Sequence, residues 1–579
     1  MAVDQLSDIV QRCQTIQDDL YTPEDYDLFQ CAARKCIEEG DSVHVLSIIV
    51  DEKNKHIVRC MGWNLVGPLV LVLLKNEENS VSPSRAIFSH LLEICSPKEL
   101  LVSLLEQVEA AEPDVIRDTV MFLLQPLQKV LLNFGRKKAT FLGMTLSTLL
   151  NQIARLPQED TAGLGQCCSG LLCFVKPFVE EAKDTRNSGV AHDEELRTEM
   201  LKFCMMSLRD PLLGLQFTDP DQQDKSFLCE FATEILAILS GIGESLPELL
   251  CHELLKKHEV PGFLEEEVRY PKESLANLAY LLFVHHIAME TFPVVLSPVF
   301  ILQCNMEHIE LLLSRTEESH LQRGLDLYEK SLVRVEDNSL SVELLEIKTF
   351  ISVPQNLVKV MTLCPVHRLR SKGLAVFQLS INKFNTEGKY KFLRCMLKTS
   401  HHSGVEGVII KNIKNQVDLS LRPGNKNVWF QGIHFLPLLR LVLSLPQGPE
   451  TDLLQNLDRI MESLNLLRYL LIRDKESDNE TGVWLELQAF NDSFMTPLRL
   501  DLNMSKAHYQ AELSNAGVKK KNANRGCDSE SVCTVSVGNE NLPNLTPEVQ
   551  IQALHSALFT FELIESVLVR IEEIIEAKP

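Results

Sequence analysis

The stretch SPKELLVSLLEQVE, residues 96–109, decides the fold class of this 579-residue chain. Its apolar residues recur at intervals of three and four, which places them on one face of an α-helix: Leu100, Leu101, Leu104, Leu105 and Val108. Ser96 precedes Pro97, and Glu99 follows three residues after Ser96, so the sequence predicts a capping box at the start of this helix. The segment therefore predicts an amphipathic helix that buries one face against a neighbour.

The same pattern recurs along the chain. Thr-Pro-Glu begins a helix at residues 22–24 and again at residues 546–548, and Gly40 ends the earlier of the two helices. Helices of roughly 10–20 residues follow one another with short polar breaks, and no alternation of strands and helices is visible. Only residues 531–537, SVCTVSV, alternate as a strand does. We therefore predict an all-α protein.

The chain is too long for one compact core, because single cores stop growing near ~250–300 residues. Helix pairs of roughly 35–50 residues without a crisp consensus favour an irregular HEAT/armadillo-like helical-repeat solenoid, and two separate helical bundles are the alternative. Charge density rises near residues 256–272, which suggests HEAT-like regions at 1–255 and 256–579. Residues 514–544 contain few large apolar side chains and predict a disordered loop.

Charge and hydropathy exclude several function classes. The 79 acidic and 57 basic residues give a formal charge of -22, which argues against nucleic acid and anionic membranes as partners. The acidic surface favours basic partners, although solubility alone is the simpler explanation. The most apolar stretch, residues 63–74, is shorter than the ~20 residues of a membrane span, and no signal peptide is visible. We expect a cytoplasmic protein, with the nucleus as a second location.

Motifs for catalysis or for metal and cofactor binding are absent from the sequence. The 16 cysteines form no C-x-x-C pair, and single cysteines within apolar helical patterns are expected to behave as small hydrophobic residues. The histidine pairs at 285–286 and 401–402 are adjacent, so on a helix their side chains point ~100° apart. No glycine-rich phosphate loop and no H-E-x-x-H or G-x-S-x-G motif occurs. We expect no enzyme activity, no cofactor and no metal.

The last helix leaves two alternatives open for its aromatic residues. One set of apolar residues has the spacing of a core stripe: Leu554, Leu558, Phe561, Leu568, Ile571 and Ile575. His555, Phe559, Glu562 and Arg570 then lie at its margins. Spacing alone favours burial of both Phe559 and Phe561, whereas a binding role requires one of them to be exposed as an anchor.

Several long strings resemble the glomulin family. These strings lie at residues 61–68, 315–340, 358–365, 402–406, 451–456, 503–509 and 554–561. They extend across nearly the whole chain, and only residues 157–165 and 514–544 match less well. The resemblance implies a HEAT-like protein whose C-terminal part binds the RING-box subunit of cullin–RING ubiquitin ligases. The bound protein would cover the RING surface that receives the ubiquitin-charged conjugating enzyme, and would thereby inhibit the ligase.

The resemblance also implies further partners, namely an FK-drug-binding immunophilin and a growth-factor receptor tyrosine kinase. A general helical adaptor for these partners is therefore the alternative function. The residues expected to bind the RING are amphipathic or aromatic types in or near the matching C-terminal strings: Trp484, Met504, His508, Tyr509, His555, Phe559 and Arg570.

Overall fold

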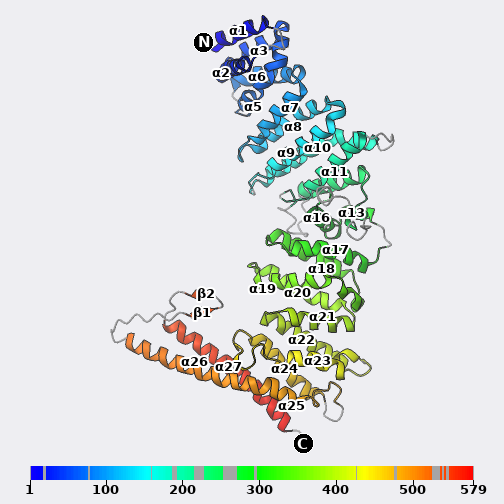
Figure 1. Ribbon diagram of the computed structural model, residues 1–579, viewed down its shortest axis with the longest axis vertical. Coiled ribbons are helices and arrows are strands. Elements are labelled where there is room, and N and C mark those ends of the chain that lie inside the picture. The colour runs from blue at the N-terminus through cyan, green and yellow to red at the C-terminus, as the bar shows by residue number, and fades with distance from the viewer. Residues whose placement is uncertain are drawn as a thin grey trace. The chain divides into compact units, whose positions relative to one another are not determined.

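The computed structural model forms two compact units, each of which is described here by itself (Figure 1). Unit 1 is Met1–Ser331 and unit 2 is Leu332–Pro579. The structure describes residues 2–16, 21–75, 78–157, 159–185, 192–210, 212–213, 227–251, 270–292, 296–425, 427–474, 479–523, 535–537, 540–542 and 547–577. The domain boundary expected at 256–272 lies almost entirely outside these residues and stays a prediction.

Unit 1 is a succession of α-helices. They are α1 (Ala2–Gln14), α2 (Pro23–Glu38), α3 (Ser42–Val50), α4 (Lys55–Met61), α5 (Val66–Lys75), α6 (Glu78–Ile94), α7 (Pro97–Glu109), α8 (Ile116–Leu132), α9 (Lys138–Ile153), α10 (Thr161–Thr185), α11 (His192–Ser207), α12 (Phe227–Gly241), α13 (Leu246–Leu250), α16 (Lys272–Phe283), α17 (Pro298–Leu313) and α18 (Glu318–Val333). Helices α8, α9, α10, α11 and α12 pack against partners one or two positions away along the chain. Neighbour-to-neighbour packing of this kind is typical of a helical-repeat solenoid rather than of a bundle around one core, so the predicted fold class is confirmed.

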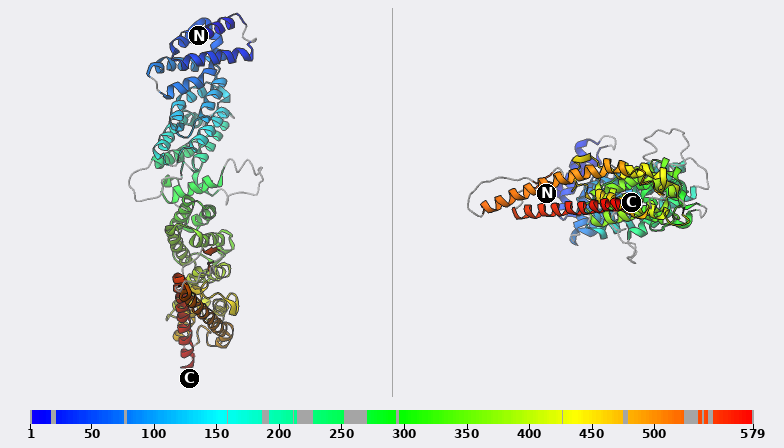
Figure 2. Two further views of the ribbon diagram at one scale, coloured as in Figure 1. Left: turned by 90° about the vertical axis from the view of Figure 1, so that its left-hand side faces the viewer. Right: turned by 90° about the horizontal axis from the view of Figure 1, so that it is seen from below.

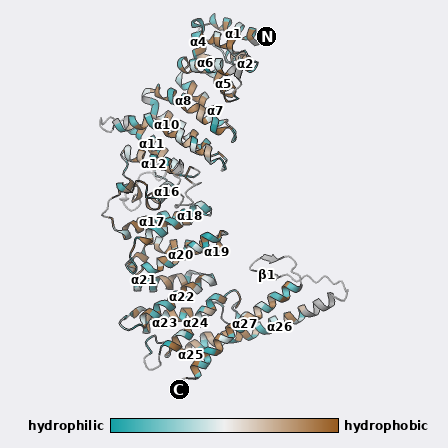
Figure 3. Ribbon diagram, turned by 180° about the vertical axis from the view of Figure 1, so that it is seen from behind, coloured by the Kyte–Doolittle hydropathy of each residue, from teal (hydrophilic) through white to brown (hydrophobic). Residues whose placement is uncertain are grey.

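Unit 2 continues the same construction. Its α-helices are α19 (Thr349–Leu363), α20 (His367–Lys383), α21 (Thr386–Thr399), α22 (Ser403–Ser420), α23 (Gly432–Val442), α24 (Leu457–Arg473), α25 (Leu487–Phe490), α26 (Thr496–Ala523) and α27 (Pro547–Glu576). A π-helical turn at Asn491–Met495 joins α25 to α26. Hydrophobic and hydrophilic residues are mixed along the helices of this unit, as expected for helices that each bury one side (Figure 3).

Helix α7 is formed by the segment from which the fold class was predicted, so it can be compared with that prediction. It begins at Pro97 and ends at Glu109, and it buries the expected leucine and valine face. Ser96 occupies the N-cap position, but its side chain makes no cap hydrogen bond, so the predicted capping box is wrong here. Because Pro97 has no N–H group, fewer backbone donors at this end need a partner. At the start of α2, by contrast, the carboxylate of Asp25 accepts hydrogen bonds from the Thr22 backbone N–H at 2.9 Å and from its hydroxyl at 2.7 Å.

The region expected to be a disordered loop, residues 514–544, contains regular structure at both of its ends. Helix α26 continues to Ala523, because alanine and lysine are good helix formers. The short strand β1 (Val535–Val537) pairs antiparallel with β2 (Glu540–Leu542), so the strand expected near 531–537 has a partner. The residues between these elements lie outside the described part of the chain.

Two stretches are long and apolar enough to cross a membrane by composition alone. They are Glu52–Lys75, which contains the apolar stretch noted at 63–74, and Thr161–Lys183. In each stretch an 18-residue apolar window is 56% buried inside the protein, as in a core helix. A 3-10 turn at Gly62–Leu65 also interrupts the first stretch, so the hydrophobic pattern is accounted for by packing within unit 1.

Candidate functional site

Helices α26 and α27 form a long antiparallel hairpin at the end of the chain (Figures 1 and 2). Two ion pairs, Arg499–Glu572 and Lys506–Glu565, join the helices along their length. The rings of Tyr509 and Phe561 meet edge to face with centroids 5.2 Å apart. From one pair to the next the residue number increases on α26 and decreases on α27. The three contacts therefore agree on a single antiparallel register.

The side of the hairpin that faces the rest of unit 2 is buried. Helix α27 packs on α24, and α26 packs on the 3-10 turn at Gly448–Glu450. The buried side chains include Leu498, Leu502, Phe561, Ile564, Leu568 and Ile571. Together these contacts hold the base of the hairpin in place, while its far end projects beyond the neighbouring helices of the unit (Figure 1).

Asp501 is a carboxylate on this buried side. Burial raises the pKa of Asp501 to about 6, and the negative charge of Asp452 acts in the same direction, whereas the hydrogen bond from the Ser505 hydroxyl at 3.2 Å opposes it. The ionised form is therefore disfavoured at the base of the hairpin. This carboxylate is a source of pH dependence in the stability of unit 2.

The outer side of each helix carries exposed apolar residues. On α27, Phe559 is 64% exposed and Leu563, one helical turn later, is also exposed. On α26, Leu500 and Met504 are exposed at the same four-residue spacing. We call these four residues the hairpin stripes. A large aromatic side chain exposed in an apolar stripe is characteristic of a protein-binding surface.

The expectation that Phe559 and Phe561 are both in the core is therefore wrong. Phe561 is 1% exposed, whereas Phe559 faces solvent. Residues two apart on an α-helix point ~200° apart, so a helix with one buried side cannot bury both. The structure agrees with the alternative in which one aromatic residue is exposed.

The residues expected to bind the RING are only partly brought together. Met504 and His508 are exposed on α26, and His555 and Phe559 are exposed on α27. Tyr509 is half-buried because it packs against Phe561, so its truncation would also loosen the hairpin.

The remaining two members of the set lie apart from this group. Arg570 is exposed and forms an ion pair with Glu573 at 2.6 Å, roughly 16 Å along α27 from Phe559. Trp484 precedes α25, is half-buried, and donates a hydrogen bond from its indole N–H to the Asp474 carbonyl at 2.9 Å. That bond ties Trp484 to the C-terminal end of α24 and gives it a structural role. The sequence interpretation missed Leu500 and Leu563, although four-residue steps from Met504 and Phe559 would have found them.

Unit 1 contains a cluster of charged residues that was not expected from the sequence. Potential metal-ligand atoms of Asp210, Glu273 and His320 lie within 4.8 Å of one another. The guanidinium of Arg323, however, lies 2.5 Å from the Asp210 carboxylate and already supplies a positive charge there. Hydrogen bonding to His320 is the main cause that lowers the pKa of Glu273. The arrangement is that of a partly buried network of charged and polar groups, and a cation would meet repulsion from Arg323.

Comparison with known proteins identifies the family. The chain matches, over residues 1–557, the family described as an uncharacterised protein family, YAP/Alf4/glomulin. The proteins named glomulin from Homo sapiens and Mus musculus are each 49% identical to this chain, over 591 and 592 aligned residues. Each alignment includes 100% of this chain and 98% of the relative.

The chain belongs to the glomulin family. The resemblance noted in the sequence is therefore confirmed over both units. Because the relatives align from end to end, the terminal hairpin is part of the region shared with human glomulin rather than an addition to it.

Proposed function

We propose that this glomulin-family protein is a non-catalytic inhibitor of cullin–RING ubiquitin ligases. It binds the RING-box subunit with the α26–α27 hairpin and covers the surface that recruits the ubiquitin-conjugating enzyme. The observation that carries the proposal is the pair of hairpin stripes, with Phe559 as an exposed aromatic anchor on a helix whose other side is fixed in the core.

The mechanism requires only that the inhibitor covers the binding surface of the conjugating enzyme, and it needs no catalytic residues. A protein that occupies the conjugating-enzyme surface blocks ubiquitin transfer by competition, and a specific interface of this kind buries about 1,600 Å² in total. A hairpin of two helices that are 28 and 30 residues long offers a long enough surface for such a contact. The net charge of -22 favours rapid encounter with a basic partner, an effect that salt weakens.

The geometry of the hairpin supports a rigid binding surface. The ion pairs of Arg499 and Lys506 and the contact between Tyr509 and Phe561 keep the two helices in one register before any partner arrives. Such preorganisation reduces the entropy that binding must remove, so more of the contact energy appears as affinity.

The test combines binding with a ubiquitination assay. The full chain is titrated into a reaction that contains purified cullin–RING ligase and its conjugating enzyme, and its affinity for isolated RING-box protein is measured in parallel. Wild-type chain is expected to inhibit chain formation. The double substitution Phe559→Ser and Leu563→Ser is expected to weaken binding at least about tenfold, because hot-spot truncations typically cost 2 kcal/mol or more.

Ile433→Ser is the matched control. Ile433 is an exposed apolar residue of the same unit on α23, which lies on the opposite side of unit 2 from the hairpin tip (Figure 1). This variant should bind and inhibit as wild type does. The proposal is wrong if the wild-type chain leaves ubiquitin-chain formation unchanged, which is the result that a general adaptor for an immunophilin or a receptor tyrosine kinase predicts. It is also wrong if the double variant binds as tightly as wild type.

A further inference from the structure

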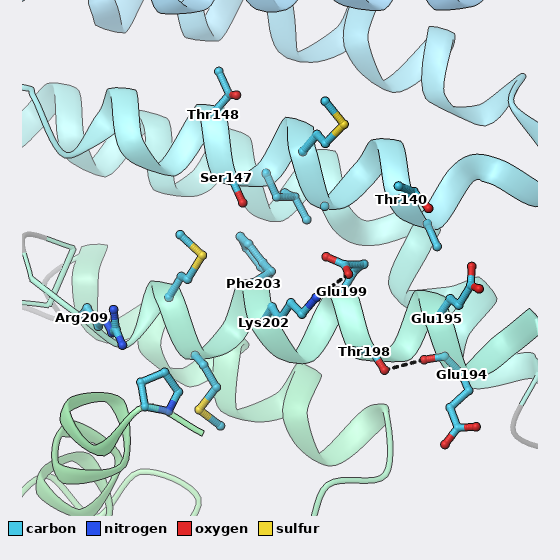
Figure 4. Close-up of a pocket in the computed structure, with 17 residues that line it drawn as sticks. Thr140, Ser147, Thr148, Glu194, Glu195, Thr198, Glu199, Lys202, Phe203 and Arg209 are labelled. Carbon is cyan, nitrogen blue, oxygen red and sulfur yellow. Dashed lines mark hydrogen bonds and ion pairs between the residues drawn. The ribbon is translucent and has the colours of Figure 1, made fainter. Parts of the chain in front are cut away.

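A groove in unit 1 lies between helices α9 and α11 and has a volume of about 1150 Å³ (Figure 4). This volume exceeds the ~300–1,000 Å³ of typical small-molecule sites. Glu194 and Arg209, which both line the groove, are 15 residues apart along and just beyond α11, or roughly 22 Å. The dimensions therefore suit a helical segment of about four turns rather than a metabolite.

Methionine side chains from both helices border the groove between its two ends. Met144 from α9 is 55% exposed and Met206 from α11 is half-buried, and both border the groove, whereas Phe203 and Met205 from α11 are buried beside it. Methionine side chains adapt their shape to apolar partners and are common on surfaces that bind helices. An amphipathic helix can bury its apolar face here.

The two ends of the groove carry opposite charge. Glu194 and Glu195 stand exposed at one end, and Arg209 lies at the other (Figure 4). Two acidic groups near Arg209, namely Asp210 and Glu273, contact Arg323 and His320 in the network described above, and the charge of Arg209 also helps to lower the pKa of Glu273. Within the described part of the chain, the Arg209 guanidinium donates one hydrogen bond, from Nε to the Ser274 hydroxyl at 3.3 Å, so its other N–H groups can reach a ligand.

The centre of the groove is shaped by a glycine. A Cβ atom at Gly143 would lie 2.1 Å from a carboxylate oxygen of Glu199, so a larger residue at 143 would displace this side chain from the α9 backbone. Lys202 holds Glu199 with an ion pair at 2.8 Å, which removes the net charge from the middle. The net charge of the groove therefore lies at its ends, with Glu194 and Glu195 at one end and Arg209 at the other.

We infer that the α9–α11 groove binds an amphipathic helix of a partner protein, with the N-terminal turn of that helix, carrying basic residues, at Glu194 and Glu195. An α-helix carries partial positive charge at its N-terminus and partial negative charge at its C-terminus, so the charges at the two ends of the groove complement this orientation. The site lies in unit 1 and does not depend on the function proposed for the hairpin of unit 2.

Two synthetic peptides test the orientation. Both have 15 residues with leucine, methionine and phenylalanine at helical spacing; one carries lysines in its first turn and glutamates in its last, and the other exchanges these charges. Binding to the full-length chain is followed by fluorescence anisotropy. The peptide that begins with lysine should bind about tenfold more tightly, since a few charge–dipole and ion-pair contacts together supply that ratio. Cations at a helix N-terminus weaken the isolated helix, so greater helicity cannot account for this preference.

Variants of exposed residues then locate the contact. Glu194→Lys combined with Glu195→Lys should reverse the preference between the peptides, and Met144→Glu should weaken binding of both. Met121→Glu is the control, because Met121 is an exposed methionine on α8 outside this groove. Equal binding of the two peptides, or binding that Met144→Glu leaves unchanged, would overturn the inference. The alternative occupant is a second copy of this chain, and sedimentation velocity tests for it. Self-association that Met144→Glu abolishes would assign the groove to that second copy and overturn the inference.

Discussion

The terminal hairpin of unit 2 and the junction of α11, α16 and α18 in unit 1 use charged residues in opposite ways. The hairpin is joined by Arg499–Glu572 and Lys506–Glu565, whose side chains are all partly exposed. At the junction, Arg323 is buried and donates hydrogen bonds to Asn277 at 2.6 Å and to Asp210 at 2.5 Å. In turn, Asn277 and Ser274 donate hydrogen bonds to backbone carbonyls at the end of α11, at 2.7 and 2.6 Å.

This contrast indicates which charged residues stabilise the fold and which lie on a surface that can bind a partner. Buried polar groups that satisfy a helix end cannot be removed without leaving donors and acceptors unpaired. Exposed ion pairs contribute little to stability, because water screens them. The junction in unit 1 is therefore expected to tolerate little change, whereas the outer side of the hairpin can vary in sequence at small cost and is free to serve a partner. Four predictions test this contrast, from the largest expected effect to the smallest.

Replacing Arg323 should have the largest effect. Arg323→Met removes the buried guanidinium that pairs with the Asp210 carboxylate and donates to the Asn277 amide oxygen, and breaking a buried pair in this way typically costs about 3–5 kcal/mol. Urea unfolding followed by circular dichroism measures the loss. Arg315→Met is the control, since Arg315 is exposed and lies 4.0 Å from its partner Glu273. If both variants unfold at the same urea concentration, the junction does not have the importance assigned to it.

The two phenylalanines of α27 give the second prediction. Phe561→Ala should lower the free energy of unfolding by about 3 kcal/mol, because it removes a buried aromatic ring and leaves a cavity. Phe559→Ala should change it by less than about 0.5 kcal/mol, since that ring already faces solvent. Urea unfolding of the two variants side by side decides the matter, and equal losses would contradict the assignment of one ring to the core and the other to the surface.

Asp501 provides the third prediction, which concerns pH. Its pKa is raised to about 6 in the folded protein from about 3.9 in the unfolded chain, so the stabilising effect of the bound proton is complete below about pH 4 and is lost as the pH rises through 6. Asp501→Asn should therefore stabilise unit 2 by about 1–2 kcal/mol at neutral pH and by much less near pH 4. Thermal or urea unfolding at the two pH values measures this; a stabilisation that is independent of pH would exclude ionisation of Asp501 as its cause.

Arg570 should give the smallest change in stability. Arg570→Glu breaks an exposed ion pair with Glu573, and the free energy of unfolding should move by no more than about 0.5 kcal/mol. If the hairpin binds a RING-box partner, the same substitution should weaken binding in a manner that depends on salt, because it reverses a charge near the interface. A large loss of stability would show that this part of α27 is structurally more constrained than its exposure indicates.

The sequence alone determined what kind of protein the chain forms and where several of its helices begin. Local rules are sufficient for this, because a proline at the first turn and apolar residues at intervals of three and four act within a single helix. Helices α2, α7 and α27 accordingly begin at Pro23, Pro97 and Pro547, as the sequence indicated. The strings that resemble the glomulin family are likewise a property of the sequence, and comparison with the relatives confirmed them.

Only the tertiary structure decided which residues meet. The spacing of apolar residues indicates that a helix has a buried side, but it does not show which other helix covers that side. Whether Phe559 or Phe561 is buried therefore depended on the packing of α27 on α24. The charged cluster in unit 1 joins Asp210, Glu273 and His320, which are 63 and 47 residues apart along the chain. Contacts at such separations depend on how several helices pack together, and no local pattern in the sequence carries that information.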